Sequence, residues 1–284
     1  MKAYQGVHLL LSTSFSLNGV LFAMWLGYQI GIASLLLQVL WSLSFILLAR
    51  YVKRIGVLSE HGTMHGVIGA TYGVKAERWA AISSLIGFLL QIGWELIVGA
   101  TIFIAALPQG SWVQGGLILA LAIIAGIYTM YGGLRGNARA NQLQNYLAAL
   151  VLCGLLGWLL LHIPRGGASA WDPGTWGRLV SSLGVGGLIT TSIFSLVWQF
   201  VDMSAWQNVI ATVNGGENAP KKALYGSALA VFIFPNLVAT LIGMYLRGIP
   251  DLTSDNILTA FIQLLSAHPI VLLLIGAGLA AAML

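Results

Sequence analysis

Long apolar runs, separated by short polar stretches, recur along this chain of 284 residues. Most of them are close to the length of about 20 residues with which an apolar helix crosses the hydrocarbon core of a bilayer. The pattern therefore predicts an all-α integral membrane protein with a single membrane domain, residues 1–284. The predicted spans cover residues 8–30, 32–54, 77–107, 112–134, 141–163, 182–206, 223–246 and 268–284.

Composition agrees with this pattern, because 58% of the residues are hydrophobic and only 7% are charged, against about 25% charged residues in soluble domains. The formal charge of +5 comes from basic residues in the short loops between spans. Such residues indicate membrane topology rather than nucleic-acid binding, and cytoplasmic loops carry most of them. Alternating the spans puts ten of the 13 Lys and Arg residues on one side. We therefore expect a multi-pass protein of the inner or plasma membrane with a cytoplasmic N-terminus.

The sixth predicted span carries an unusual set of polar residues. It begins as an ordinary apolar helix, and then polar residues interrupt the sequence before any basic loop is reached. They are Gln199, Asp202, Ser204 and Gln207. A carboxylate at bilayer depth costs roughly 3 kcal/mol or more, so it tends to face a cavity or a polar partner. This span, including Trp198, is our candidate for the element that carries a solute.

The first predicted span is also broken up by polar residues, among them Ser12, Ser16 and Asn18. Two interpretations remain open. Serine and threonine hydroxyls bond to their own helix backbone, which favours a packed helix interface. Alternatively, the helix is unwound here and its carbonyl groups line an ion site.

The third predicted span places Gln91 and Glu95 four residues apart and hence on one helical face. Glu95 is a carboxylate deep in a predicted span, and such residues mark substrate or proton pathways. It either lines a solute cavity or a proton path, or it is a neutral acid that hydrogen-bonds to a neighbouring helix.

Two further features concern the shape of the helices. Gly132, Gly133 and Gly136 predict a turn between the fourth and fifth spans, in a basic cytoplasmic loop. Pro235 and Asn236 at mid-depth in the seventh span predict a packing kink.

The residues do not predict an enzyme. No glycine loop followed by lysine and no GxSxG elbow occurs in the sequence. His61 and His65 have helical spacing near Glu60, but a third ligand at suitable spacing is missing, so we predict neither a metal site nor a cofactor. The single Cys153 forms no internal disulfide.

Three stretches resemble motifs of the solute:sodium symporter family. They are YTMYGGLRGNARANQLQ, DMSAWQNVIAT, and IPDLTSDNILTAFIQLL followed by GLAAAML. The resemblance implies an inverted-repeat bundle similar to the leucine-transporter fold. Residues 8–163 are then the first five-helix repeat, and residues 182–284 are a second repeat that is incomplete. Because the last apolar run stops at Leu284, we expect a fragment of a longer transporter.

The resemblance also implies binding sites. Its sodium site uses carbonyls of the broken first helix and a later alanine carbonyl, and the matching candidates here are Ser12, Phe15, Ser16 and Ala282. The candidate substrate-binding residues lie in the first, third and sixth predicted spans. They are Asn18, Gln91, Glu95, Trp198, Gln199 and Asp202. The chain departs from the family pattern at Asn141, where the family usually has Asp, and at Asn208, where a basic residue is common.

The expected function is secondary active transport, with sodium-coupled import of a small organic solute by alternating access. The expected partners are the solute, sodium and the lipid bilayer, without nucleic acid, and the sequence predicts no oligomeric state. Two alternatives stay open: a proton-coupled or uncoupled permease of the same fold, and a non-transporting membrane sensor or subunit.

Overall fold

The structure, a computed structural model, describes residues 1–52, 61–106, 111–162, 175–216 and 218–247 and the single positions 249, 265, 268 and 271. The regular structure of this described part is entirely helical, which confirms the all-α prediction. Five helical segments within it are long and apolar enough to span a membrane, and they are Leu17–Tyr51, Val74–Val98, Gly136–His162, Trp176–Val201 and Ala219–Leu246. The chain is therefore a multi-pass membrane protein.

The helices follow one another with short connections. In chain order they are α1 (Ala3–Ser14), α2 (Leu17–Ile30), η1 (Gly31–Ser34), α3 (Leu35–Tyr51), α5 (Met64–Tyr72), α6 (Val74–Ala106), α7 (Ser111–His162), α8 (Thr175–Val201), α9 (Met203–Thr212), η3 (Val213–Gly215), α10 (Ala219–Val231), η4 (Phe232–Val238) and α11 (Ala239–Leu246).

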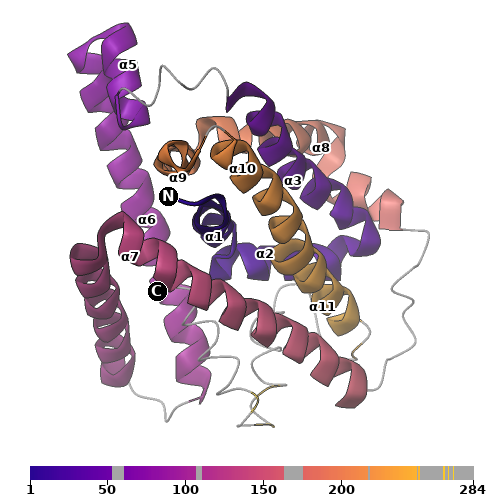
Figure 1. Cartoon of the computed structure of the whole chain (residues 1–284). Helices are drawn as coiled ribbons and strands as arrows, with labels where there is room; N and C mark the ends of the chain where they lie inside the picture. The colour runs from indigo at the N-terminus through magenta and orange to yellow at the C-terminus, as the bar shows by residue number, and fades with distance from the viewer. Residues whose placement is uncertain are drawn as a thin grey trace.

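The two short helices at the N-terminus occupy the interior of the bundle. Figure 1 shows α1 near the middle, with α6 and α7 on one side and α3 and α8 on the other. α1 packs against α7, α9 and α10, and α2 packs against α11. Phe15, Leu10 and Leu17 are among the most deeply buried side chains, with at most 1% exposed. The apolar residues on either side of the break between α1 and α2 are thus part of a tightly packed core, whereas Ser16 is half-buried and Asn18 is exposed.

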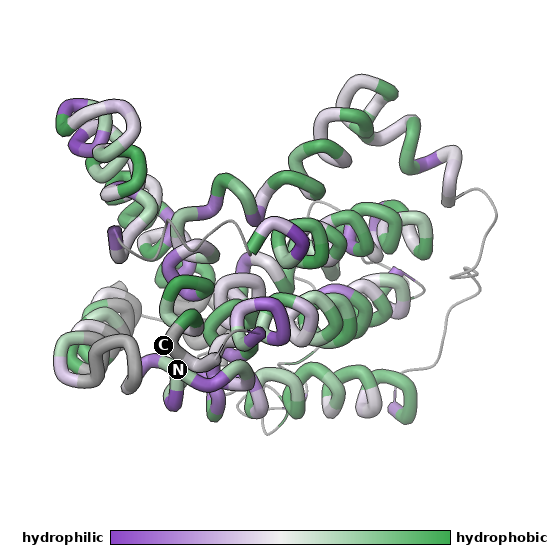
Figure 2. The backbone as a smooth tube through the Cα atoms, turned by 45° about the horizontal axis from the view of Figure 1, so that its top comes forward, coloured by the Kyte–Doolittle hydropathy of each residue, from purple (hydrophilic) through white to green (hydrophobic). Residues whose placement is uncertain are grey.

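The outer helices present apolar side chains on their exposed faces. Leu85 and Leu90 of α6 and Ile189 and Ile193 of α8 are all more than half exposed. Figure 2 shows the same property as green colour along most of the helices. Exposed apolar surface of this extent marks contact with a membrane or a partner, which agrees with the apolar spans.

α2 and α11 approach each other closely at two glycines. A Cβ added to Gly27 would overlap the backbone of Thr240, and one added to Gly243 would overlap the backbone of Met24. Small residues allow this close backbone contact between membrane helices, where packing replaces the hydrophobic effect as the cause of association.

The prediction that the helix ends in a turn at Gly132, Gly133 and Gly136 is wrong. α7 continues as helix through all three positions, although Figure 1 shows that its two halves meet at a sharp bend. A helix keeps its backbone groups hydrogen-bonded in an apolar environment. Glycine, which has no Cβ, accommodates a bend without steric overlap. The predicted spans 112–134 and 141–163 are therefore parts of one helical element.

The irregularity predicted in the seventh span is confirmed. Pro235 and Asn236 lie in η4, a stretch of π-helix between α10 and α11. Proline removes one backbone donor and clashes with the preceding turn, and a widened turn accommodates both effects. The eighth predicted span, residues 268–284, and the outer loop before it lie almost entirely outside the described residues.

Candidate transport site

The first predicted span is two half-helices. α1 ends at Ser14 and α2 begins at Leu17, and between them Phe15 and Ser16 leave the helical path. Ser16 is extended, with ψ 151°, and its hydroxyl accepts a hydrogen bond from the N–H of Gly19 at 3.0 Å. This is the usual geometry of a serine N-cap. Of the two interpretations left open for this span, the interrupted helix is the one that its backbone shows.

The hydroxyl groups of α1 fit the other interpretation of this span, which is a packed helix interface. Ser12 donates to the carbonyl of Leu9 at 2.8 Å, and Thr13 donates to that of Leu10 at 2.7 Å. The Ser12 hydroxyl in turn accepts a hydrogen bond from the Asn141 amide of α7 at 2.9 Å. Upstream of the break, α1 is therefore a packed interface. Asn141 of α7 is one of the partners in this interface.

Glu95 of α6 meets the start of α2. The backbone N–H of Asn18 donates to Glu95 Oε2 at 3.2 Å. The N–H of Leu17 and the hydroxyl of Ser16 also lie near this carboxylate. The first N–H groups of a helix have no partner within the helix, and its N-terminus carries a partial positive charge. Glu95 provides a hydrogen-bond acceptor for these N–H groups and places a carboxylate next to the partial positive charge.

The start of α2 is consequently capped from two sides. Glu95 accepts from the N–H of Asn18, and Ser16 accepts from that of Gly19. The next N–H, that of Val20, already bonds to the Ser16 carbonyl. Any anion that approaches this end of α2 therefore competes with Glu95.

A second break separates α8 from α9. Asp202 caps α9, and its Oδ1 accepts from the Ser204 N–H at 2.8 Å and from the Ser204 hydroxyl at 2.6 Å. The Trp206 indole N–H donates to the Phe200 carbonyl at 2.8 Å. Both contacts satisfy backbone groups that a continuous helix would have paired. The polar interruption predicted in the sixth span is thus a true helix break.

α8 has a further irregularity near its start. Gly184 has φ 67° and ψ 163°, so the helix is kinked there. A positive φ of this kind is accessible to glycine without steric cost. The predicted span 182–206 accordingly begins at a kink, because α8 itself starts at Thr175.

Gln199 is the most unusual polar residue of α8. Its side chain is 1% exposed, and within the described part of the chain neither atom of its amide has a hydrogen-bond partner. Next to it, the Trp198 ring stacks on Trp41 of α3, with 5.6 Å between ring centroids, and contacts Phe194 at 4.8 Å. A buried amide without partners costs about 1–3 kcal/mol. Gln199 therefore has unused capacity to bind a polar group.

The halves of the two broken helices pair in opposite order. α1 lies against α9, and α2 lies against α8. The first pair is joined by a hydrogen bond of 3.3 Å from the Asn208 amide to the Leu9 carbonyl. The first half of one broken helix thus contacts the second half of the other. Asn208, where the family commonly has a basic residue, serves this contact.

The sequence predictions missed one polar contact near α1. Asn145 of α7 is buried and donates to the His8 carbonyl at 2.9 Å, with His8 Nδ1 at 3.4 Å. The Tyr146 ring lies edge-on to His8 at 5.0 Å. Asn141 and Asn145 are four residues apart in an apolar helix, the same spacing as Gln91 and Glu95. The four-residue spacing of Asn141 and Asn145 is the feature of the sequence from which a polar contact of α7 could have been predicted.

The predicted site residues therefore fall into two groups. Ser16, Asn18 and Glu95 come together at the first break. Trp198, Gln199 and Asp202 lie along the second. Gln91 is exposed on α6, one helical turn before Glu95. Ala282 lies outside the described residues.

We compared the chain with protein-family models, with curated proteins and with solved structures, and none of these comparisons found a match. The resemblance to the solute:sodium symporters accordingly depends on the sequence motifs. The contacts define a coarser class, a multi-pass helical membrane protein with two interrupted helices packed half against half.

Proposed function

We propose that this chain is the transport core of a solute:sodium symporter, which imports a small organic solute across the inner or plasma membrane by alternating access. The observation that carries the proposal is the pairing of the two broken helices, α1 with α9 and α2 with α8. In an inverted repeat, the first helix of each repeat is broken, and the two broken helices run in opposite directions. The observed pairing is the one that this arrangement requires.

Helix breaks inside a membrane support a transport role because they are costly. Each unsatisfied backbone group in hydrocarbon costs several kcal/mol, so irregular backbone persists there only where it is buried in protein or lines a cavity. At the first break Glu95 supplies acceptors, and at the second Asp202 and Trp206 supply partners. A chain that needed only to span the membrane would gain nothing from these arrangements.

The solute site of this proposal is formed by the two groups of residues at the breaks. Gln199 offers an amide donor and acceptor without partners, and Trp198 offers an aromatic face. Glu95 and the end of α2 offer a carboxylate surrounded by donors. A small solute with both polar and apolar parts fits this combination.

The sodium site is proposed at the first break. Sodium is a hard cation that prefers oxygen ligands, as other such cations do. Ser12 and Ser16 carry hydroxyl oxygens there, and Phe15 contributes a carbonyl. The hydroxyl of Ser14 is buried without a partner among the described residues. This unpaired oxygen supports an ion site beside it.

The test is transport by the purified protein, reconstituted into vesicles. Uptake of a panel of amino acids, carboxylates, vitamins and sugars is measured with an inward sodium gradient, with a proton gradient, and with potassium in place of sodium. We expect uptake of one class to require the sodium gradient. Gln199→Leu should abolish this uptake, whereas Gln207→Leu, at an exposed position of α9, should preserve it. Uptake that is indifferent to sodium, or equal loss in both variants, would contradict the proposal.

Glu95 favours a second candidate, a proton-coupled permease of the same fold. An intramembrane carboxylate at a helix break is a natural proton acceptor. Its protonation would remove one acceptor from the start of α2 and change how this half-helix is capped. In that case Glu95→Gln abolishes uptake driven by a pH gradient, and sodium has no effect in either protein. A sodium requirement that persists with pH clamped on both sides would rule out this candidate.

A further inference from the structure

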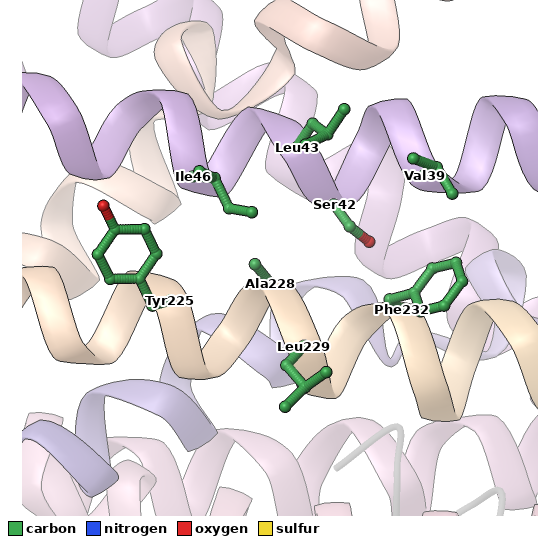
Figure 3. A pocket seen from close by; sticks show the side chains of 8 residues that line it. All are labelled: Val39, Ser42, Leu43, Ile46, Tyr225, Ala228, Leu229 and Phe232. Atoms are coloured by element: carbon green, nitrogen blue, oxygen red, sulfur yellow. The ribbon is translucent and has the colours of Figure 1, made fainter.

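A groove with a volume of about 290 Å³ lies between α3 and the α10–η4 segment, and neither Glu95 nor Gln199 lines it. Its lining is apolar apart from Ser42 and the hydroxyl of Tyr225. Figure 3 shows Ile46 opposite Tyr225 at one end and Val39 opposite Phe232 at the other. Three of its lining side chains, Val39, Leu43 and Leu229, are exposed on the outer surface. The groove therefore opens to the surroundings of the helices, where the lipid lies.

The two helices run in opposite directions along this groove. Residue numbers rise along α3 from Val39 to Ile46 while they fall along α10 from Phe232 to Tyr225 (Figure 3). The C-terminal end of α3 and the N-terminal end of α10 consequently lie at the same end of the groove. That end is the one where Tyr225 lies.

Basic residues gather at this end. Arg50 lies in the last turn of α3, one turn beyond Ile46, and it is exposed. Lys221 and Lys222 lie in the first turn of α10. The Lys221 ammonium is 5.8 Å from the centre of the Tyr225 ring. An apolar groove thus ends at three cations and an exposed aromatic ring.

We propose that this groove binds an anionic phospholipid, with one acyl chain between α3 and α10 and the phosphate at Arg50, Lys221 and Lys222. Basic residues next to a membrane span attract anionic headgroups, and tyrosine favours the headgroup level of a bilayer. The charge of the groove's end selects the headgroup, and the apolar lining takes the chain.

The length of the groove fits this occupant. From Arg50 to Val39 is 11 residues of helix, which corresponds to about 16 Å at about 1.5 Å per residue. One leaflet of the hydrocarbon core is about 15 Å thick, half of about 30 Å. A lipid whose phosphate lies at Arg50 therefore reaches Val39 with the end of its chain.

The first test compares lipids by native mass spectrometry of the purified protein. Phosphatidylglycerol and phosphatidylcholine with identical chains are added at equal concentration, and the retained adducts are counted. We expect phosphatidylglycerol to be retained at least roughly tenfold more than phosphatidylcholine. The triple variant Arg50→Gln, Lys221→Gln and Lys222→Gln should lose this preference. Equal retention of both lipids by the unaltered protein would overturn the proposal.

A matched control separates the groove from general surface charge. The variant with Lys75→Gln, Arg78→Gln and Arg139→Gln removes the same charge from exposed positions of α6 and α7. It should keep the preference, and its loss here would overturn the groove as the site. Glycerol phosphate, which has the headgroup without chains, should fail to displace the lipid. Complete displacement by it would identify a simple anion site and contradict the acyl-chain assignment.

A second pair of variants tests the chain directly. Ala228→Trp fills the groove, and we expect it to reduce phosphatidylglycerol retention at least roughly tenfold, to the level of phosphatidylcholine. Ser42→Ala, at a facing position in the same groove, removes a hydroxyl without filling space and should leave retention unchanged. Retention that is unaltered in Ala228→Trp would show that the chain lies elsewhere.

Discussion

Replacement of Glu95 tests how α2 is capped inside the membrane. The variants Glu95→Ala and Glu95→Gln both remove the charge, so the cost of burying a carboxylate is absent from their comparison. They differ because glutamine keeps a carbonyl acceptor at the start of α2, whereas alanine leaves the N–H of Asn18 without one. We therefore expect Glu95→Ala to be the less stable of the two.

The size of the difference follows from the N–H of Asn18, whose hydrogen bond to Glu95 lies at an exposed position. Loss of a capping acceptor at a helix N-terminus costs about 0.5–2 kcal/mol. We expect the free energy of unfolding of Glu95→Ala to be about 0.5–2 kcal/mol below that of Glu95→Gln. At about 2–4 °C per kcal/mol for a chain of about this length, the melting temperatures differ by about 1–8 °C.

The assay is thermal unfolding of the purified protein in one detergent, measured for both variants and for Gln91→Ala. Gln91 lies one turn before Glu95 on α6 and is exposed, so its replacement should change stability by no more than about 0.5 kcal/mol. Equal melting temperatures for the alanine and glutamine variants at position 95 would refute the capping role. A comparable loss in Gln91→Ala would show that α6 is sensitive as a whole.

Three further predictions use the same unfolding assay. Gly243→Ala should cost about 1–3 kcal/mol because the new methyl group overlaps the backbone of α2, whereas Gly154→Ala, with open space around it, should be neutral or slightly stabilising. Asp202→Ala should cost about 1 kcal/mol through loss of the α9 cap, and Asp202→Asn should recover most of it. Gln199→Leu should stabilise the protein by about 1 kcal/mol or more, because it removes an unpaired buried amide. Lower stability of Gln199→Leu would contradict the unpaired amide. Equal stability of the two glycine variants would contradict the close helix contact, and equal stability of the two Asp202 variants would contradict the cap.

The sequence predicted where the helices are interrupted, because polar residues in apolar runs are costly and therefore informative. Ser16 and Asp202 were singled out on this ground, and each caps a half-helix. Helical spacing also put Gln91 and Glu95 on one face of α6. It did not predict that this face meets the start of α2, because periodicity within a helix carries no information about which other helix it contacts.

The features that the sequence did not predict, the bent helix α7 and the contact of Asn145, also depend on packing between helices. Gly132 and Gly136 suggested a turn, but glycine also permits a bent helix, and only packing decides between the two. Asn145 bonds to a carbonyl of α1, a backbone group that every residue has. Sequence alone does not mark such an acceptor. Contacts between a side chain and a distant backbone group therefore escaped prediction, while contacts within one helix did not.

The two breaks differ in how completely their polar groups are satisfied, and this difference points to where a solute would bind. At the first break, Glu95 and Ser16 occupy the N–H groups of α2. At the second, Asp202 caps α9, yet Gln199 one turn earlier is buried, and neither of its amide atoms has a partner among the described residues. A ligand gains most where it supplies hydrogen bonds that the protein lacks, and least where it must displace those already made. The α8 side of the breaks is therefore the place where we expect solute binding to begin, and α2 becomes available only when Glu95 moves away.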